Sequence, residues 1–110
     1  VYSIERDPVL AKKAQNRLKK LGFKNVRVIV GDGFLGFKKA APYQGIILTA
    51  APQEVPPALV NQLVEGGRLV APVGSSFNQR LVRIKKIKGE IKTEDFGFCS
   101  FVPMTMGIEK

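Results

Sequence analysis

Two short apolar runs near the start of the chain are separated by an amphipathic stretch. The runs cover residues 1–4 and 26–30. Their β-branched composition predicts two strands, the second covered on both faces. Between them, Asp7-Pro8 is a typical helix start and Gly22 a typical helix end. The apolar stripe of this helix follows spacings of four, four and three residues and consists of Leu10, Ala14, Leu18 and Leu21.

A similar alternation continues to residue 74. Residues 45–48 predict a third buried strand, and the small residues at 50–52 predict a loop after it. Pro56-Pro57 begins a second helix, which we expect to end at Gly66-Gly67. The apolar stripe of that helix consists of Leu59, Val60, Leu63 and Val64. Residues 68–73 then predict a fourth strand.

The pattern changes beyond residue 74. Residues 81–87 alternate apolar with basic positions, as in a half-exposed antiparallel strand, and residues 91–96 return after a turn at Gly89-Glu90. Residues 98–104 predict a last apolar strand, with Cys99 in the core. The whole order predicts an α/β fold, in which a mostly parallel sheet with right-handed crossovers carries antiparallel C-terminal strands.

Composition narrows the class of protein. The 110 residues suffice for one domain, and 45% of them are hydrophobic, enough for a core. No apolar run reaches the ~20 residues of a membrane span, and we expect no signal peptide. A single cysteine fits a reducing compartment, so we expect a cytoplasmic protein. Without histidine, a zinc site or a Ser-His-Asp triad is excluded, and no metal is expected.

The formal net charge of +9 has two interpretations. A basic chain can bind nucleic acid or an acidic surface. The positive residues, however, alternate with core positions on the first helix and on the late hairpin, as solvated faces do. We favour solvated faces.

Candidate chemistry lies where two predicted strands end. Glu5 closes the first strand, and Asp32 follows the second within Gly31-Asp32-Gly33. Ligands of open α/β sheets bind just outside the carboxyl ends of the strands. One carboxylate there can accept two hydrogen bonds from a ribose diol, and the next can accept one from an exocyclic amine. The alternatives are a solvated strand-end acid for Glu5 and a plain turn residue for Asp32.

Several stretches occur in the order found in one enzyme family. They are Val-Tyr-Ser-Ile-Glu at 1–5, Leu-Gly-Phe-Lys-Asn-Val at 21–26, Val-Gly-Asp-Gly at 30–33, Ala-Pro-Tyr at 41–43, Thr-Ala-Ala-Pro-Gln-Glu-Val-Pro at 49–56, Gly-Gly-Arg-Leu-Val-Ala-Pro-Val-Gly at 66–74 and Phe-Val-Pro at 101–103. Together they resemble the protein-L-isoaspartate O-methyltransferases across essentially the whole chain.

The resemblance implies a Rossmann-like class I methyltransferase that uses S-adenosylmethionine to esterify the stray carboxylate of L-isoaspartyl residues in damaged proteins, a repair reaction. It implies that Glu5 holds the ribose hydroxyls and that Asp32, with the backbone of Gly33, lies against the adenine. It also implies that Thr49, Ala50 and Ala51 line the mouth where methyl donor and peptide meet. A hydroxyl that merely caps the strand end is the alternative for Thr49.

The chain departs from the family pattern at its start. In the family, a first strand with a Gly-rich loop and a Ser-containing segment precede the position of Val1, and Gln44 stands where an Asp is usual. We therefore expect residues 1–110 to be the C-terminal portion of a single methyltransferase domain, inactive alone. The absent strand would lie between the strands at 1–5 and 45–49, so we expect exposed edges and self-association of the isolated chain.

Two other functions stay open. One is a class I methyltransferase acting on nucleic acid, for example on tRNA adenine, which shares the acidic strand end and a basic surface. The other is a non-catalytic basic module that binds nucleic acid. The chain shows no interleaved exposed aromatics typical of single-strand binders, so we expect isoaspartyl-containing proteins or peptides as partners and consider nucleic acid unlikely.

Overall fold

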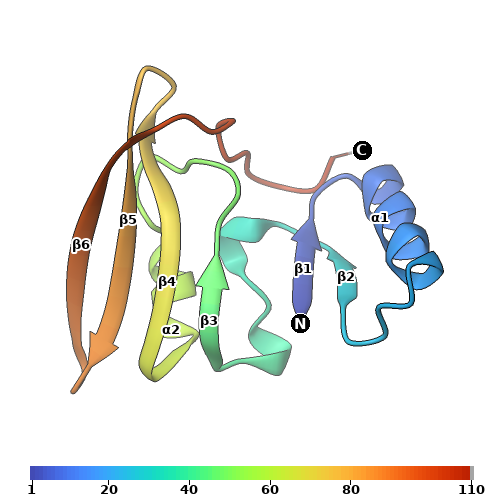
Figure 1. Cartoon of the computed structure of the whole chain (residues 1–110), viewed down its shortest axis with the longest axis horizontal. Helices are drawn as coiled ribbons and strands as arrows, with labels where there is room; N and C mark the ends of the chain where they lie inside the picture. Colours follow the sequence, from blue (N-terminus) through green and yellow to red (C-terminus); the bar gives the residue numbers. More distant parts are fainter. Residues whose placement is uncertain (110) are drawn as a thin grey trace. The chain divides into compact units, whose positions relative to one another are not determined.

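The computed structural model describes residues 1–109, which fall into two compact units. Of the described residues, the first unit contains Val1–Phe37 and residues 106–109, and the second contains Lys38–Thr105. Each unit has its own sheet, of two and four strands (Figure 1).

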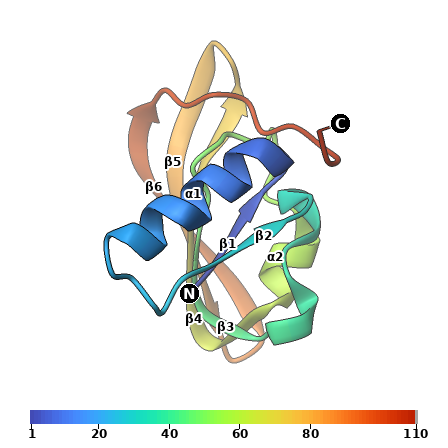
Figure 2. The same ribbon diagram turned by 90° about the vertical axis from the view of Figure 1, so that its right-hand side faces the viewer.

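The first unit is a parallel strand pair connected by a helix. Strands β1 (Tyr2–Glu5) and β2 (Arg27–Val30) pair in parallel, with Glu5 opposite Val30. Helix α1 (Pro8–Lys20) lies across both strands (Figure 2). A parallel pair needs such a crossover, because the chain must return to the same end of the sheet.

The predicted boundaries of α1 are confirmed. Asp7 is the N-cap, and its Oδ1 accepts hydrogen bonds from the backbone N–H groups of Val9 at 2.9 Å and Leu10 at 3.3 Å. At the other end Gly22 adopts φ +85°, the left-handed conformation that glycine accepts without strain. Both helix ends depend on residues that are neighbours in the sequence, so the sequence alone predicts them.

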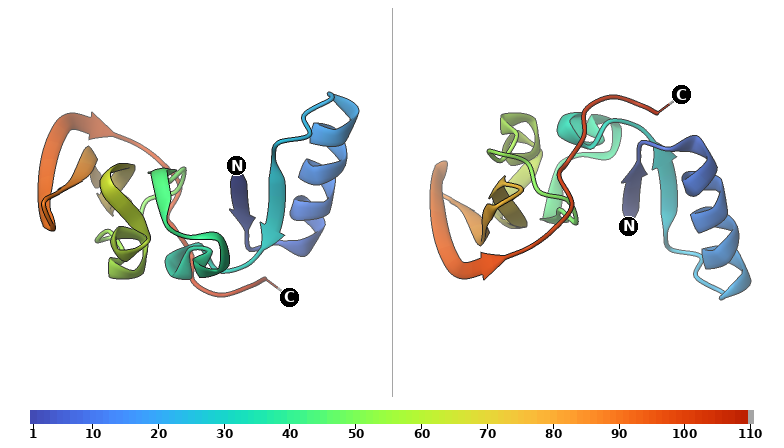
Figure 3. Two further views of the ribbon diagram at one scale, coloured as in Figure 1. Left: turned by 90° about the horizontal axis from the view of Figure 1, so that it is seen from below. Right: turned by 90° about the horizontal axis from the view of Figure 1, so that it is seen from above.

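The second unit is a twisted sheet in the order β3-β4-β5-β6 (Figures 1 and 3). Its strands are β3 (Tyr43–Ile47), β4 (Leu63–Ser75), β5 (Asn78–Ile87) and β6 (Glu90–Cys99). Strands β3 and β4 pair in parallel, whereas β4–β5 and β5–β6 are antiparallel, as the predicted switch beyond residue 74 requires. Among the described strands, β1 pairs only with β2 and β3 only with β4, so each has one unpaired edge.

The buried core lies in the second unit, between the sheet and the short helix α2 (Pro57–Asn61). Its buried members are Leu48, Leu59, Leu63, Leu69, Ala71 and Ile84. Two predicted burials are wrong within residues 1–109. Val30 in β2 is 42% exposed and Ile47 in β3 is 74% exposed, so neither strand is covered on both faces.

The second helix is shorter than predicted. It ends at Asn61, not at Gly66-Gly67, and Leu63 already belongs to β4. The reason is non-local: the backbone N–H of Tyr43 donates to the carbonyl of Gln62 at 2.6 Å, and Leu63 pairs with Tyr43. Residues from Leu63 onward therefore pair in the sheet, although their apolar spacing predicted a continuation of the helix.

The predicted last strand, residues 98–104, is also wrong. Strand β6 ends at Cys99, and beyond it the chain forms one isolated bridge, between Pro103 and Ala51. Cys99 is half-buried and lies outside the core, next to Phe98, which is 79% exposed.

Candidate functional site

Glu5 and Asp32 lie at the carboxyl ends of neighbouring parallel strands. Glu5 is the last residue of β1, and its carbonyl accepts a hydrogen bond from the backbone N–H of Gly31 at 3.0 Å. Asp32 is the next residue, two positions beyond the end of β2. The structure thus brings the two predicted acids to the same edge of one sheet, where α/β folds bind ligands.

The carboxylate of Glu5 is available to a ligand. Its side chain is half-buried, and no hydrogen bond or ion pair to it is found within residues 1–109. Its neighbour Arg6 is occupied. The Arg6 guanidinium donates from Nε to the carbonyl of Gly107 at 3.1 Å and pairs with Glu109 at 3.4 Å.

Asp32 caps a short helix with one carboxylate oxygen and keeps the other as a possible acceptor for a ligand. Its Oδ1 accepts a hydrogen bond from the backbone N–H of Phe34 at 2.9 Å, which caps the short helix η1 (Gly33–Leu35). This is the turn role that the sequence left open for it. A carboxylate has a second oxygen, so the cap does not use up its capacity to accept.

The predicted substrate loop follows β3 in the second unit. The backbone N–H of Leu48 donates to the carbonyl of Val70 at 2.9 Å, and the chain then bends at Thr49 and Ala50. Thr49 is exposed, Ala50 is half-buried and Ala51 is buried. We call residues 49–51 the substrate loop, after the role that the sequence predicts for them.

The substrate loop is held from two sides. Ala51 donates its N–H to the carbonyl of Val102 at 2.7 Å and accepts from the N–H of Met104 at 2.9 Å. Next to it, the carbonyl of Pro52 accepts from the N–H of Gly74 at 3.0 Å. Gly74 has φ +135°, and a Cβ there would lie 2.1 Å from the carbonyl oxygen of Asn78. Only glycine fits this position.

Sequence reasoning missed Gln79. This polar residue lies inside β5 and is 3% exposed, with both polar atoms of its side chain bonded to the backbone of Phe101. Its position in an alternating basic and apolar strand predicts nothing of this kind.

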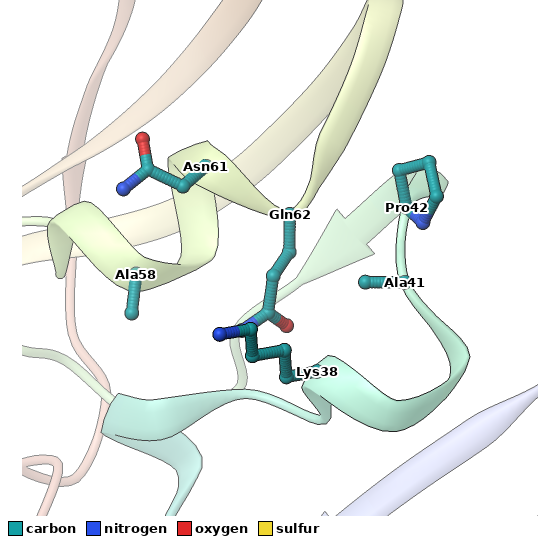
Figure 4. Close-up of a pocket in the computed structure, with 6 residues that line it drawn as sticks. All are labelled: Lys38, Ala41, Pro42, Ala58, Asn61 and Gln62. Carbon is teal, nitrogen blue, oxygen red and sulfur yellow. The ribbon is translucent and has the colours of Figure 1, made fainter.

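A pocket lies elsewhere in the second unit, between α2 and the short helix η2 (Lys38–Ala40) (Figure 4). It is lined by Lys38, Ala41, Pro42, Ala58, Asn61 and Gln62. None of the predicted site residues lines this pocket.

Several basic residues of the hairpin have acidic partners. Arg83 contacts Glu94 at 2.9 Å and Lys85 contacts it at 3.2 Å, while Arg80 pairs with Asp95. Hydrogen bonds from Arg83 and then Lys85 lower the pKa of Glu94, and the hydrogen bond from Arg80 lowers the pKa of Asp95. These pairs support the interpretation of the hairpin as a solvated face.

Two further searches cover the described part of the chain. No group of three or more potential metal ligands is found in residues 1–109. None of the helices in this part of the chain has the length and apolar character needed to cross a bilayer.

Comparison with known proteins gives consistent matches. The family model described as protein-L-isoaspartate(D-aspartate) O-methyltransferase matches residues 1–109. A protein-L-isoaspartate O-methyltransferase of Alkalilimnicola ehrlichii is 49% identical over 108 residues, covering 97% of this chain and 49% of the relative. The enzyme of the same name from Pyrococcus abyssi is 50% identical over 106 residues, which cover 94% of this chain and 49% of that relative. The chain spans about half the length of the curated relatives it matches.

Two solved structures resemble the fold. One, a protein-L-isoaspartate O-methyltransferase, aligns with a TM-score of 0.88 at 28% identity and covers 97% of this chain and 35% of that one. The other, a putative protein-L-isoaspartate O-methyltransferase from Plasmodium falciparum in complex with S-adenosyl-L-homocysteine, aligns with a TM-score of 0.82 at 24% identity, covering 96% and 52%. The predicted Rossmann-like methyltransferase architecture is thereby confirmed. The names of these proteins give no support to the alternative of a nucleic-acid methyltransferase.

Proposed function

This chain belongs to the protein-L-isoaspartate O-methyltransferase family, and from that premise we propose that the whole enzyme methylates L-isoaspartyl residues of damaged proteins. By "whole enzyme" we mean a protein of the full length of these relatives that contains this chain. The methyl donor is S-adenosylmethionine, and the product ester starts repair toward normal aspartate. The observation that carries the proposal is the family match over residues 1–109.

The placement of two acids supports a role in holding the cofactor. Glu5 and Asp32 lie at one sheet edge, and the Glu5 carboxylate has no partner within residues 1–109. We assign Glu5 to the ribose hydroxyls, and Asp32 with the backbone of Gly33 to the adenine. When bound, S-adenosylmethionine supplies a methyl group already activated on a sulfonium.

Where the substrate binds, this chain contributes small side chains that leave room for both ligands and help to align them. Thr49, Ala50 and Ala51 have small side chains, which suits a place where two ligands approach closely. An ionised carboxylate is already a nucleophile, so no side chain needs to remove a proton. Alignment of the substrate carboxylate is what such a site must provide. The absence of histidine is therefore compatible with the reaction.

The setting of the protein is part of the same proposal. Its partners are proteins or peptides that contain isoaspartyl residues, and its compartment is the cytoplasm. The free thiol of Cys99 is consistent with a reducing compartment.

The test uses a pair of synthetic peptides that differ only in one linkage, L-isoaspartyl against L-aspartyl. The whole enzyme is incubated with S-adenosylmethionine carrying a labelled methyl group, and base-labile label on each peptide is counted. We expect label on the isoaspartyl peptide alone. Equal labelling of both peptides, or of neither, would reject the proposed activity.

A further inference from the structure

A buried amide side chain replaces a strand partner in the second unit. Gln79 lies in β5 with 3% of its surface exposed. Its Nε2 donates to the carbonyl of Phe101 at 2.9 Å, and its Oε1 accepts from the backbone N–H of the same residue at 2.7 Å. A carboxamide offers one donor and one acceptor side by side, as the backbone of a paired strand does.

This arrangement has a reason in the local fold. Strand β6 ends at Cys99, so the backbone of Phe101 is beyond the ladder that β5 provides. The amide of Gln79 is buried, and a buried polar group without a partner costs free energy, whereas here the part-buried backbone of Phe101 satisfies it. Gln79 supplies both partners at once, and an apolar residue of similar size would supply neither.

The segment that Gln79 holds leads directly to the substrate loop. Val102 follows Phe101, and its carbonyl accepts from the N–H of Ala51 at 2.7 Å. Met104 donates to the carbonyl of Ala51 at 2.9 Å. Two pairs of hydrogen bonds, separated by at most three residues, therefore connect the Gln79 side chain to the backbone of Ala51.

We propose that Gln79 is a positioning residue for the methyl-transfer reaction. Its amide sets the place of residues 101–104, and these set the backbone of Ala51 and thus the substrate loop. Gln79 itself touches neither substrate nor methyl donor. This inference rests on the proposed function, because it takes residues 49–51 as the place where peptide binds.

The first arm of the test measures the connection itself. Amide hydrogen exchange is compared in the whole enzyme with and without Gln79→Met, which keeps the size of the side chain and removes both hydrogen bonds. The matched control is Gln44→Met, at an exposed position of β3. We expect roughly tenfold faster exchange at Phe101, Ala51 and Met104, as the loss of two hydrogen bonds implies, and no change in the β5–β6 ladder.

The second arm separates positioning from plain stability. In Gln79→Met we expect KM for the isoaspartyl peptide to rise about tenfold while Kd for S-adenosylmethionine stays within twofold, because the acids assigned to the cofactor belong to the other unit. Gln79→Asn keeps an amide that is one methylene too short to reach both groups of Phe101, and it should shift KM in the same direction. Gln44→Met should leave both constants unchanged.

The outcomes are distinct. Faster exchange at Phe101 with unchanged exchange at Ala51 would overturn the inference, and so would an unchanged peptide KM in both Gln79 variants. An unsubstituted enzyme that labels no isoaspartyl peptide would reject the proposed function instead. In that case the exchange arm still decides whether Gln79 holds the loop.

Discussion

Removing the Glu5 carboxylate should weaken cofactor binding with little effect on folding. A hydrogen bond to a charged group contributes roughly 1.5–3 kcal/mol. Glu5 is half-buried, so partial screening by water favours the lower part of this range. For Glu5→Ala we therefore expect Kd for S-adenosylmethionine to rise by roughly tenfold to fortyfold. Because the carboxylate has no partner within residues 1–109, stability should change by less than ~0.5 kcal/mol.

The assay is isothermal titration calorimetry of the whole enzyme with S-adenosylmethionine. Glu5→Gln keeps an acceptor oxygen and removes the charge, so its Kd should fall between those of the unsubstituted enzyme and Glu5→Ala. Glu54→Ala removes an exposed acid from the second unit and serves as the control. A Kd for Glu5→Ala within twofold of the unsubstituted value, with normal thermal unfolding, would show that Glu5 does not hold the cofactor.

Three further predictions concern the fold and its charges. Ile84 is 6% exposed and Ile47 is 74% exposed. In denaturant titrations, Ile84→Ala should therefore lower the free energy of unfolding by ~2–5 kcal/mol and Ile47→Ala by under ~1 kcal/mol. Similar losses for the two variants would contradict the core described above. The pKa of Glu94 is lowered by Arg83 and Lys85, so its contribution to stability is present above the ordinary value of about 4.3 and is lost as pH falls through the lower folded value. In Arg83→Gln, an NMR titration should show the Glu94 midpoint rising while that of Asp95 stays in place, and a common shift of both would contradict the pairing. The chain alone should self-associate through the unpaired edges of β1 and β3, whereas a sharp thermal transition of a monomer in sedimentation-checked samples would count against this.

Local signals in the sequence predicted where α1 begins and ends, whereas the predicted apolar stripe of α1 is wrong at Leu10 and Leu21, which are 50% and 66% exposed. Asp7 and Gly22 place the ends of α1 because a cap depends on neighbouring residues alone. The end of β1 at Glu5 and the turn at Asp32 after β2 also followed from neighbouring residues. Their placement at one sheet edge then follows from the rule that a helix between two strands makes a parallel pair.

Features that depend on distant pairing were predicted poorly. The stripe that includes Leu63 fits a helix, yet Leu63 pairs with Tyr43, some twenty positions earlier, and joins β4. Gln79 lies in a strand that alternates basic with apolar residues, and only the fold shows that its side chain hydrogen-bonds to the backbone of Phe101. A single sequence does not show which distant backbone group a buried side chain will hydrogen-bond to.

The C-terminal end of the described chain has a consequence for protein engineering. Arg6, next to Glu5, donates to the carbonyl of Gly107, and its own carbonyl accepts from the N–H of Glu109 at 2.8 Å. Truncation before residue 107, or a purification tag fused tightly there, would therefore disturb the backbone beside the acid assigned to the ribose. Any change made at residues 107–109 should therefore leave the Arg6 contacts intact.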